Sequence, residues 1–337
     1  HYTGGITMTN KKLTMEEQGA VDLGCVELKK RVSYLNKDFV WSFSPRKGVE
    51  VFIIDTKLTS ELVCSRPVSG PEKIDLFASS GMEMVKLLKE AVFSGLGSIF
   101  ECVIQRGGAH FRPDDFASIL KNRKVSCSNW TMQRVEVQTP TGPDWRVEVK
   151  KNPTNLDGLS QANSIFVWED CAATGSTLAK LIFQLRQQSL YLRRGDQRIY
   201  VFVPFLSNIA YWRLLTEVAE LDIKLTLICF GIYDLVENGW DGRYNTDIVI
   251  PQDAYGRGNV LIPNRQVSGY WNYYKPNFNF ERGPCLVGDV GESTGGELEV
   301  ADYVRKTGAE INHFCSWNSP AVKEMLSIYS TEEALVQ

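Results

Sequence analysis

The chain has 337 residues, of which 43% are hydrophobic and 23% charged, the balance of a folded globular protein and not of a disordered one. Lys and Arg total 37 against 40 Asp and Glu, and the net charge of −3 excludes a generally basic protein that coats nucleic acid. No apolar run approaches the roughly 20 residues of a transmembrane helix, so we expect no membrane span.

Cysteine and histidine usage narrows the class further. The eight cysteines are widely scattered without a C-x-x-C pair, which indicates free thiols in a reducing compartment and neither a disulfide scaffold nor a zinc ribbon. Only three histidines are present, which argues against a multi-histidine metal site. Residues 1–7, ahead of Met8, lack the charged and apolar regions of a secretory signal, and we expect a cytoplasmic protein.

The N-terminal segment, residues 8–75, is expected to be an addition to the core. Its pattern predicts a helix over about Met15–Leu35, followed by two short strands at Val49–Asp55 and Glu61–Ser65. These elements do not form repeated strand–helix units.

Residues 76–255 alternate short apolar strands with helices and are expected to form the core. Strands are predicted at Ser98–Gln105, Ser164–Trp168, Ile199–Val203, Leu225–Phe230 and Thr246–Ile250. Helices are predicted at Met82–Val92, Pro113–Lys121, Leu178–Leu185 and Ile209–Glu220. A Gly- and Pro-containing turn joins Thr131–Val137 to Trp145–Val149 and predicts an antiparallel hairpin. Strands separated by helices imply an α/β fold, with a mainly parallel central sheet flanked by helices.

The C-terminal segment, residues 256–337, is rich in Gly, Asn and aromatic residues and is expected to end in helices as a second addition. An aromatic cluster within it comprises Tyr270, Trp271, Tyr273 and Tyr274. Such a cluster can stack on the ring of a substrate, but core or interface packing is the favoured interpretation.

The most informative stretch runs from Ile165 to Thr177. An apolar strand ends in two adjacent acids, Glu169 and Asp170, and a loop of small residues then opens an amphipathic helix. The backbone N–H groups of such a loop, with the helix N-terminus behind them, bind phosphate. The acids would repel that phosphate and suit neutral hydroxyls, such as those of a ribose. The stretch therefore predicts a sugar-phosphate site; the alternative is a strand–helix turn capped by Thr or Ser.

This arrangement resembles the 5-phosphoribosyl 1-diphosphate (PRPP) motif of type I phosphoribosyltransferases, in which a hydrophobic strand, an acidic pair and a Thr/Gly-rich loop follow one another. The resemblance implies that Glu169 and Asp170 hold the ribose hydroxyls. The residues that it assigns to the 5′-phosphate are Ala173, Thr174, Gly175, Ser176 and Thr177. Trp168 stands where the family usually has an aliphatic residue, and Cys171 and Ala172 replace larger apolar residues, which indicates a distant branch.

A second element of the family is a short loop that binds pyrophosphate at the end of an earlier strand. Arg106, Gly107 and Gly108 follow the predicted strand Ser98–Gln105 and match this element. Two glycines let the backbone approach an anion closely, and an arginine supplies a charged fork. Alone, the three residues favour a plain turn; their place on an earlier strand, some sixty residues before the acidic pair, is what favours the pyrophosphate loop.

A third element of the family is a long loop that closes over the substrate. The region Arg134–Asn163 has the corresponding place and carries Arg146, Lys150 and Lys151. We expect a cation here, with Lys150 as the candidate, to close on the pyrophosphate. A solvated hairpin with ordinary surface charge is an equal alternative.

The resemblance implies transfer of a phosphoribosyl group from PRPP to an acceptor, with Glu169, Asp170 and Arg106 as catalytic residues. The implied cofactor is Mg²⁺, held mainly by PRPP and water and not by a metal site of the protein. The acceptor would be a nucleobase or a natural-product amine or hydroxyl, chosen by hood segments at residues 8–75 and 256–337. No nucleic acid or membrane partner is expected, and a homodimer is compatible with the sequence. Two alternatives are a regulator that senses PRPP or a nucleotide, and a hydrolase of ribosyl compounds.

Overall fold

The computed structural model describes residues 33–36, 40–64, 71–105, 107–114, 116–120, 125–140, 142–151, 153, 155–189, 192, 196–238, 245–250 and 260–277, and all structural observations refer to these. The predicted helix over Met15–Leu35 lies outside them except at its end, and so do residues 278–337.

The described chain contains a nine-stranded sheet in which six neighbouring strands are parallel. Its order is β1-β2-β3-β11-β9-β7-β4-β5-β6, with the parallel run from β3 to β5 and antiparallel pairs at both ends. In sheet order the strands are Ser33–Asn36, Val40–Arg46, Val49–Ile54, Lys224–Cys229, Arg198–Phe202, Ser164–Trp168, Ile99–Ile104, Val125–Thr139 and Gly142–Lys151. The predicted α/β class, with a mainly parallel central sheet flanked by helices, is confirmed.

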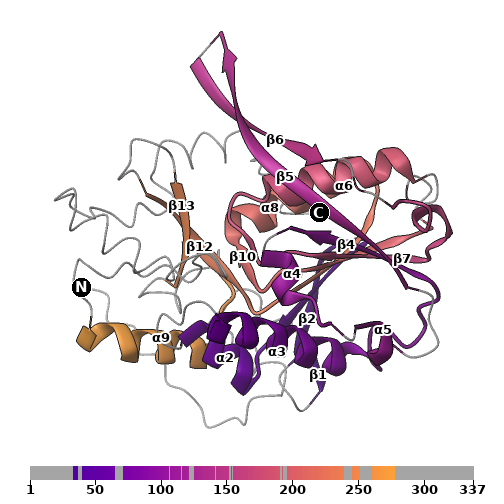
Figure 1. The fold of residues 1–337 in the computed structure, drawn as a ribbon. Helices are drawn as coiled ribbons and strands as arrows, with labels where there is room; N and C mark the ends of the chain where they lie inside the picture. Colours follow the sequence, from indigo (N-terminus) through magenta and orange to yellow (C-terminus); the bar gives the residue numbers. More distant parts are fainter. Residues whose placement is uncertain are drawn as a thin grey trace.

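Helices cover both faces of this sheet (Figure 1). The described helices are α2 (Lys57–Cys64), α3 (Pro71–Leu88), α4 (Gly107–Phe111), α5 (Phe116–Ile119), α6 (Ser176–Gln188), α8 (Asn208–Leu221) and α9 (Asn264–Asn277). Alternate residues of β7 belong to opposite cores: Ile165 and Val167 join the core beneath α6 and α8, while Phe166 and Trp168 join the core beneath α3. Burial on both faces explains why β7 is a continuous apolar run. None of the described helices is long and apolar enough to cross a membrane.

A second sheet continues from the carboxyl ends of the central strands. It has four described strands in the order β13-β12-β10-β8, with bounds Asn245–Val249, Gly231–Asn238, Phe205–Ser207 and Cys171–Ala172. β8 begins after β7 with only Glu169 and Asp170 between them, and β12 begins one residue after β11. The acidic pair therefore lies at the junction of the two sheets.

The predicted hairpin is confirmed and is longer than expected. The first part of β5 pairs with β4 as far as Ile104 opposite Trp130, and from Thr131 onward β5 pairs with β6 alone. The hairpin consequently extends past the carboxyl edge of the central sheet, as Figure 1 shows at the top of the molecule. It projects from the same edge that carries the acidic pair.

Two expectations for the N-terminal segment are wrong. Residues 61–64 of the predicted strand Glu61–Ser65 lie in helix α2, because Thr56 and Thr59 cap its first turn reciprocally, with N···Oγ1 distances of 2.9 and 3.2 Å. Residues 33–35, the predicted end of the first helix, lie in β1, which pairs with β2. Because β1, β2 and β3 extend the central sheet, the described part of residues 8–75 shares the core of the chain.

Helix α9 shows how the C-terminal segment joins the core. Arg265 Nε donates to Asp55 Oδ1 over 2.6 Å at the end of β3, and the Tyr233 hydroxyl donates to Gln266 Oε1 over 2.8 Å. Tyr270, from the aromatic cluster, is only 1% exposed and packs in the core, which agrees with the favoured interpretation. The structure does not describe the side chains of Trp271, Tyr273 and Tyr274. Four of the eight cysteines, Cys102, Cys127, Cys171 and Cys229, form no disulfide, as expected.

Candidate functional site

The acidic pair is held by the backbone at the end of β7. The Glu169 N–H donates to the Phe202 carbonyl of β9 over 3.0 Å, which continues the parallel ladder by one residue. The Asp170 N–H donates to Glu169 Oε1 over 3.2 Å, and the Cys171 N–H donates to Asp170 Oδ1 over 2.9 Å. Both carboxylates are thus oriented by the turn between the two sheets, with Glu169 buried and Asp170 half-buried.

Glu169 is the less solvent-exposed acid of the pair. Burial raises the pKa of the Glu169 carboxyl well above its usual value, and the neighbouring Asp170 carboxylate raises it further. The Arg134 guanidinium of the hairpin acts in the opposite direction. A ligand that brings hydroxyl donors or a cation to the Glu169 carboxyl would therefore interact with a group that burial shields from solvent.

The two glycines after β4 pack against the acidic pair. A β-carbon on Gly107 would overlap the Asp170 carboxyl group, and one on Gly108 would overlap the Trp168 carbonyl. Both glycines form the first turn of the short helix α4, where the sequence predicted a loop. The two motifs, some sixty residues apart, therefore meet in space. Arg106, the cation expected between them, lies outside the described residues.

An ion pair links Arg112, the residue that follows α4, to the buried Glu101 of β4. Glu101 of β4 has no exposed side-chain surface and accepts two hydrogen bonds from Arg112, at 2.9 Å from Nε and 2.8 Å from Nη2. The Trp168 indole also donates to Glu101 Oε1 over 2.9 Å. The Trp168 N–H therefore satisfies a buried carboxylate, which gives the indole at this position of β7 a structural role. In the sequence, the sign of this network is the acidic residue Glu101, which interrupts the apolar run of β4.

The small-residue loop, residues 173–176, opens helix α6 in the predicted place. Gly175 is the N-cap residue of α6 and adopts a left-handed conformation with φ +72°. Because glycine has no side chain, it provides no side-chain hydrogen bond to the first turn of α6. A β-carbon on Gly175 would lie 3.0 Å from the Ala210 Cα, so α8 passes directly behind the loop. Thr174 Oγ1 and Ser176 Oγ lie 2.9 Å apart. The arrangement leaves N–H and hydroxyl donors at one helix N-terminus, which suits a phosphate.

Sequence reasoning missed a cation at this loop. Arg213 of α8 donates from Nη1 to Ser176 Oγ, and its Nε lies 3.9 Å from Glu217 Oε1 on the same helix. Arg213 lies almost forty residues after the small-residue loop, in a segment whose apolar periodicity predicted a helix and nothing more. Nothing in the local sequence marks it as a neighbour of Ser176.

The hairpin cations divide between its two faces. Val149 packs on the core, and the adjacent Lys150 is exposed on the alternate face of β6. Arg134 of β5 is paired with Val147 and is the hairpin arginine whose charge acts on Glu169. Arg146 is paired with Val135 and, like Lys150, is exposed. Arg134 is therefore a further candidate beside Lys150.

Among the described residues, no group of three or more His, Cys, Asp and Glu side chains is arranged to hold a metal ion. Glu169 and Asp170 are two carboxylates at one turn, and they fit a metal only if a ligand and water complete its shell.

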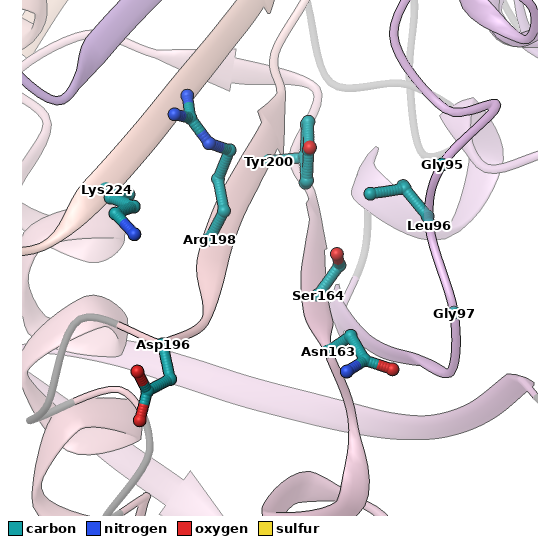
Figure 2. Close-up of a pocket in the computed structure, with 9 residues that line it drawn as sticks. All are labelled: Gly95, Leu96, Gly97, Asn163, Ser164, Asp196, Arg198, Tyr200 and Lys224. Carbon is teal, nitrogen blue, oxygen red and sulfur yellow. The ribbon is translucent and has the colours of Figure 1, made fainter.

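A pocket of about 480 Å³ lies at the other edge of the central sheet, at the amino ends of β7, β9 and β11 (Figure 2). Arg198 lines it, but this guanidinium is bonded to Glu50 over 2.8 Å and to Thr226 over 3.0 Å. Asp196 and Lys224 bring opposite charges to the same wall. The pocket therefore lacks the features of the loop at α6 and is not part of the candidate site.

Comparisons with known proteins report structural likeness only. Neither a family model nor a curated protein matches the chain. Similar solved structures include an adenine phosphoribosyltransferase from Trypanosoma brucei in complex with AMP, pyrophosphate and ribose-5-phosphate, at 9% identity over 55% of this chain and 84% of that one, with a TM-score of 0.32. A hypoxanthine-guanine phosphoribosyltransferase from Bacillus anthracis is 14% identical over 40% and 67%, with a TM-score of 0.26. A hypothetical protein from Neisseria gonorrhoeae with bound ppGpp is 13% identical over 41% and 68%, with a TM-score of 0.25.

Proposed function

We propose that this chain is a phosphoribosyltransferase that moves the 5-phosphoribosyl group of PRPP to an acceptor and releases pyrophosphate. One observation supports this most strongly: the acidic pair, the loop at α6 and the glycines of α4 converge at the carboxyl edge of one parallel sheet. Open α/β sheets bind their ligands at this edge. The three elements suit the ribose hydroxyls, the 5′-phosphate and the pyrophosphate of a single molecule.

The ribose is assigned to the acidic pair. Asp170, bonded to the Cys171 N–H, retains acceptor capacity for a sugar hydroxyl, and so does Glu169. As the bond between the anomeric carbon and the pyrophosphate oxygen breaks, the sugar gains positive charge, and the two carboxylates stabilise it electrostatically. The acceptor then forms its bond to the same carbon from the opposite face.

The phosphates are assigned to backbone and cations. Ala173, Thr174, Gly175, Ser176 and Thr177 surround the 5′-phosphate at the start of α6. The leaving pyrophosphate lies against Gly107 and Gly108, with Arg106, Lys150 and Arg134 as the cations that stabilise its charge. Bound Mg²⁺ would offset further charge on the pyrophosphate oxygens, held by PRPP, water and the acidic pair.

The acceptor is assigned to the far side of the acidic pair. The second sheet continues directly from that turn through β8. We propose that residues 256–337, with the part of residues 8–75 outside the central sheet, form the hood segments that complete the acceptor pocket. A nucleobase or a natural-product amine or hydroxyl is the proposed class. A cytoplasmic protein, alone or as a homodimer, is consistent with soluble substrates of this kind.

The experiment is an assay of pyrophosphate release from PRPP and Mg²⁺, with and without a panel of nucleobases, amines and alcohols. A transferase releases pyrophosphate only with its acceptor. Release without any acceptor would instead identify a hydrolase, and PRPP binding without release would identify a regulator. Absence of PRPP binding would overturn the proposed transferase.

A further inference from the structure

One face of α8 forms the rear wall of the loop at α6. Ser207, the residue before the helix, donates to the Ala173 carbonyl and accepts from the Ala210 N–H over 2.9 Å. Ala210 packs against Gly175, and Arg213 bonds to Ser176. The three contacts recur every third residue and therefore lie on one side of α8. The conformation of the loop is consequently set by α8 as well as by its own sequence.

Arg213 is the charged member of this face. Its side chain is only 13% exposed, so its charge acts through a medium with little water. Glu217 Oε1 lies 3.9 Å from its Nε and offsets part of that charge. Ser176 is the hydroxyl through which Arg213 reaches the loop.

The direction of the hydrogen bonds follows from the chemistry of the groups. Arginine only donates hydrogen bonds, so Ser176 Oγ accepts from Arg213. The hydroxyl hydrogens of Ser176 and Thr174 are therefore not donated to the guanidinium. Ser176 and Thr174 share one of their two hydroxyl hydrogens across the 2.9 Å that separates them. Whichever of the two donates, the second hydrogen is left for a ligand. The chain from Arg213 to Ser176 to Thr174 therefore ends in a donor that a guanidinium polarises.

We propose that Arg213 is a positioning residue that orients the hydroxyls of Ser176 and Thr174 toward a phosphate group and strengthens their donation. The inference rests on the proposed function, because it takes the 5′-phosphate of PRPP as the anion. It adds to that function a cation from outside the loop motif. Arg213 does not itself contact the phosphate; it acts through Ser176.

The test is calorimetric titration of two probes, ribose 5-phosphate alone and pyrophosphate with Mg²⁺. Arg213→Gln should weaken ribose 5-phosphate binding by about tenfold or more, the size expected for loss of a charge-assisted hydrogen bond. It should leave pyrophosphate binding within about twofold, because pyrophosphate is assigned to the glycines of α4. Arg213→Lys, which restores a cationic donor, should recover part of the affinity. The matched control is Arg186→Gln, at an arginine of α6 that donates to the Leu221 carbonyl over 3.1 Å.

Non-additivity separates a chain of bonds from a general loss of packing. Ser176→Ala should weaken ribose 5-phosphate binding as much as Arg213→Gln does, and the double variant should be no weaker than either. This comparison also holds if Arg213→Gln fails to fold, because unchanged binding by Ser176→Ala then overturns the inference. Equal losses for both probes, or additive losses, would overturn it as well. If the unaltered protein binds neither PRPP nor ribose 5-phosphate, the proposed function fails instead.

Discussion

Gly107 packs directly against the Asp170 side chain, so that a β-carbon on this glycine would overlap the Asp170 carboxyl group. The contact joins the end of β4 to the turn after β7 and fixes how close the two motifs come. It also places the buried backbone of α4 directly beside that carboxylate.

Substituting the two glycines should affect binding and stability to different extents. Gly107→Ala meets the Asp170 carboxyl group and the Asp170 Cβ, which rotation of the side chain does not move, and should reduce PRPP affinity about tenfold or more as well as destabilise the fold. Gly108→Ala meets the Trp168 backbone and should destabilise the fold by about 1–3 kcal/mol. Gly95→Ala is the control, since no atom lies within 4 Å of its β-carbon position. Urea unfolding and calorimetry measure both quantities; equal behaviour of all three variants would contradict the packing described.

The ion pair at the fully buried Glu101 should contribute more to stability than the pair at the half-exposed Glu50. Arg112→Met leaves Glu101 buried without its cation and should cost about 3–5 kcal/mol in urea unfolding. Trp168→Phe removes a single hydrogen bond to Glu101 and should cost about 1–3 kcal/mol. Arg198→Met, at the partly exposed pair with Glu50, should cost no more than about 1 kcal/mol. Equal costs at the two arginines would show that the Glu101 network does not hold β4 to β7.

The raised pKa of Glu169 predicts a pH-dependent stability. Burial keeps the proton on the native carboxyl at pH values where the unfolded chain has lost it, so the unfolding free energy falls as pH rises from the ordinary value toward the raised pKa. The slope over that interval is about 1.4 kcal/mol per pH unit. Glu169→Gln should therefore be more stable than the unaltered protein at pH 8 and should lose this advantage toward pH 4. Thermal melts across pH measure this, with Glu136→Gln at an exposed carboxyl as control. A difference that stays constant with pH would contradict the prediction.

Two glycines with positive φ allow the loop at α6 to be tested against a plain turn. Gly48 has φ +81° and only one neighbour for a β-carbon, at 3.8 Å, so Gly48→Ala should cost about 1–2 kcal/mol for its conformation alone. Gly175→Ala adds the close approach of Ala210 and should cost more, with a loss of ribose 5-phosphate binding that Gly48→Ala does not share. Chemical unfolding and calorimetry give the two comparisons. Equal costs with unchanged binding would contradict the packing of α8 on the loop.

Local patterns predicted two central elements, β7 from its continuous apolar run and α6 from its helical stripe of apolar residues. The strand Ser164–Trp168 and the stripe of α6 were predicted in place, since each is read from neighbouring residues alone. β11 was predicted, at Leu225–Phe230, but β12 was not, because only Phe230 separates the two strands. The helix α2 was missed because its signal is the cap formed by Thr56 and Thr59, not its short apolar segment.

Contacts between distant elements could not be predicted from one sequence. The bonds of Arg213 to Ser176 and of Trp168 to Glu101 depend on which helices and strands become neighbours. Arg134 acts on Glu169 only because the hairpin extends past the carboxyl edge of the sheet. The motif predicted which groups belong to the candidate site, but not which groups support them.

The most direct test of the proposed site is calorimetric titration of PRPP with Mg²⁺ into the double variant Glu169→Gln and Asp170→Asn. PRPP binding and pyrophosphate release should both be lost while the thermal melt shows an intact fold. The matched double variant Glu50→Gln and Asp196→Asn, in the region of the pocket at the opposite edge of the sheet, should bind PRPP like the unaltered protein. Unchanged affinity and unchanged turnover in the Glu169 and Asp170 variant would contradict the assignment of the site.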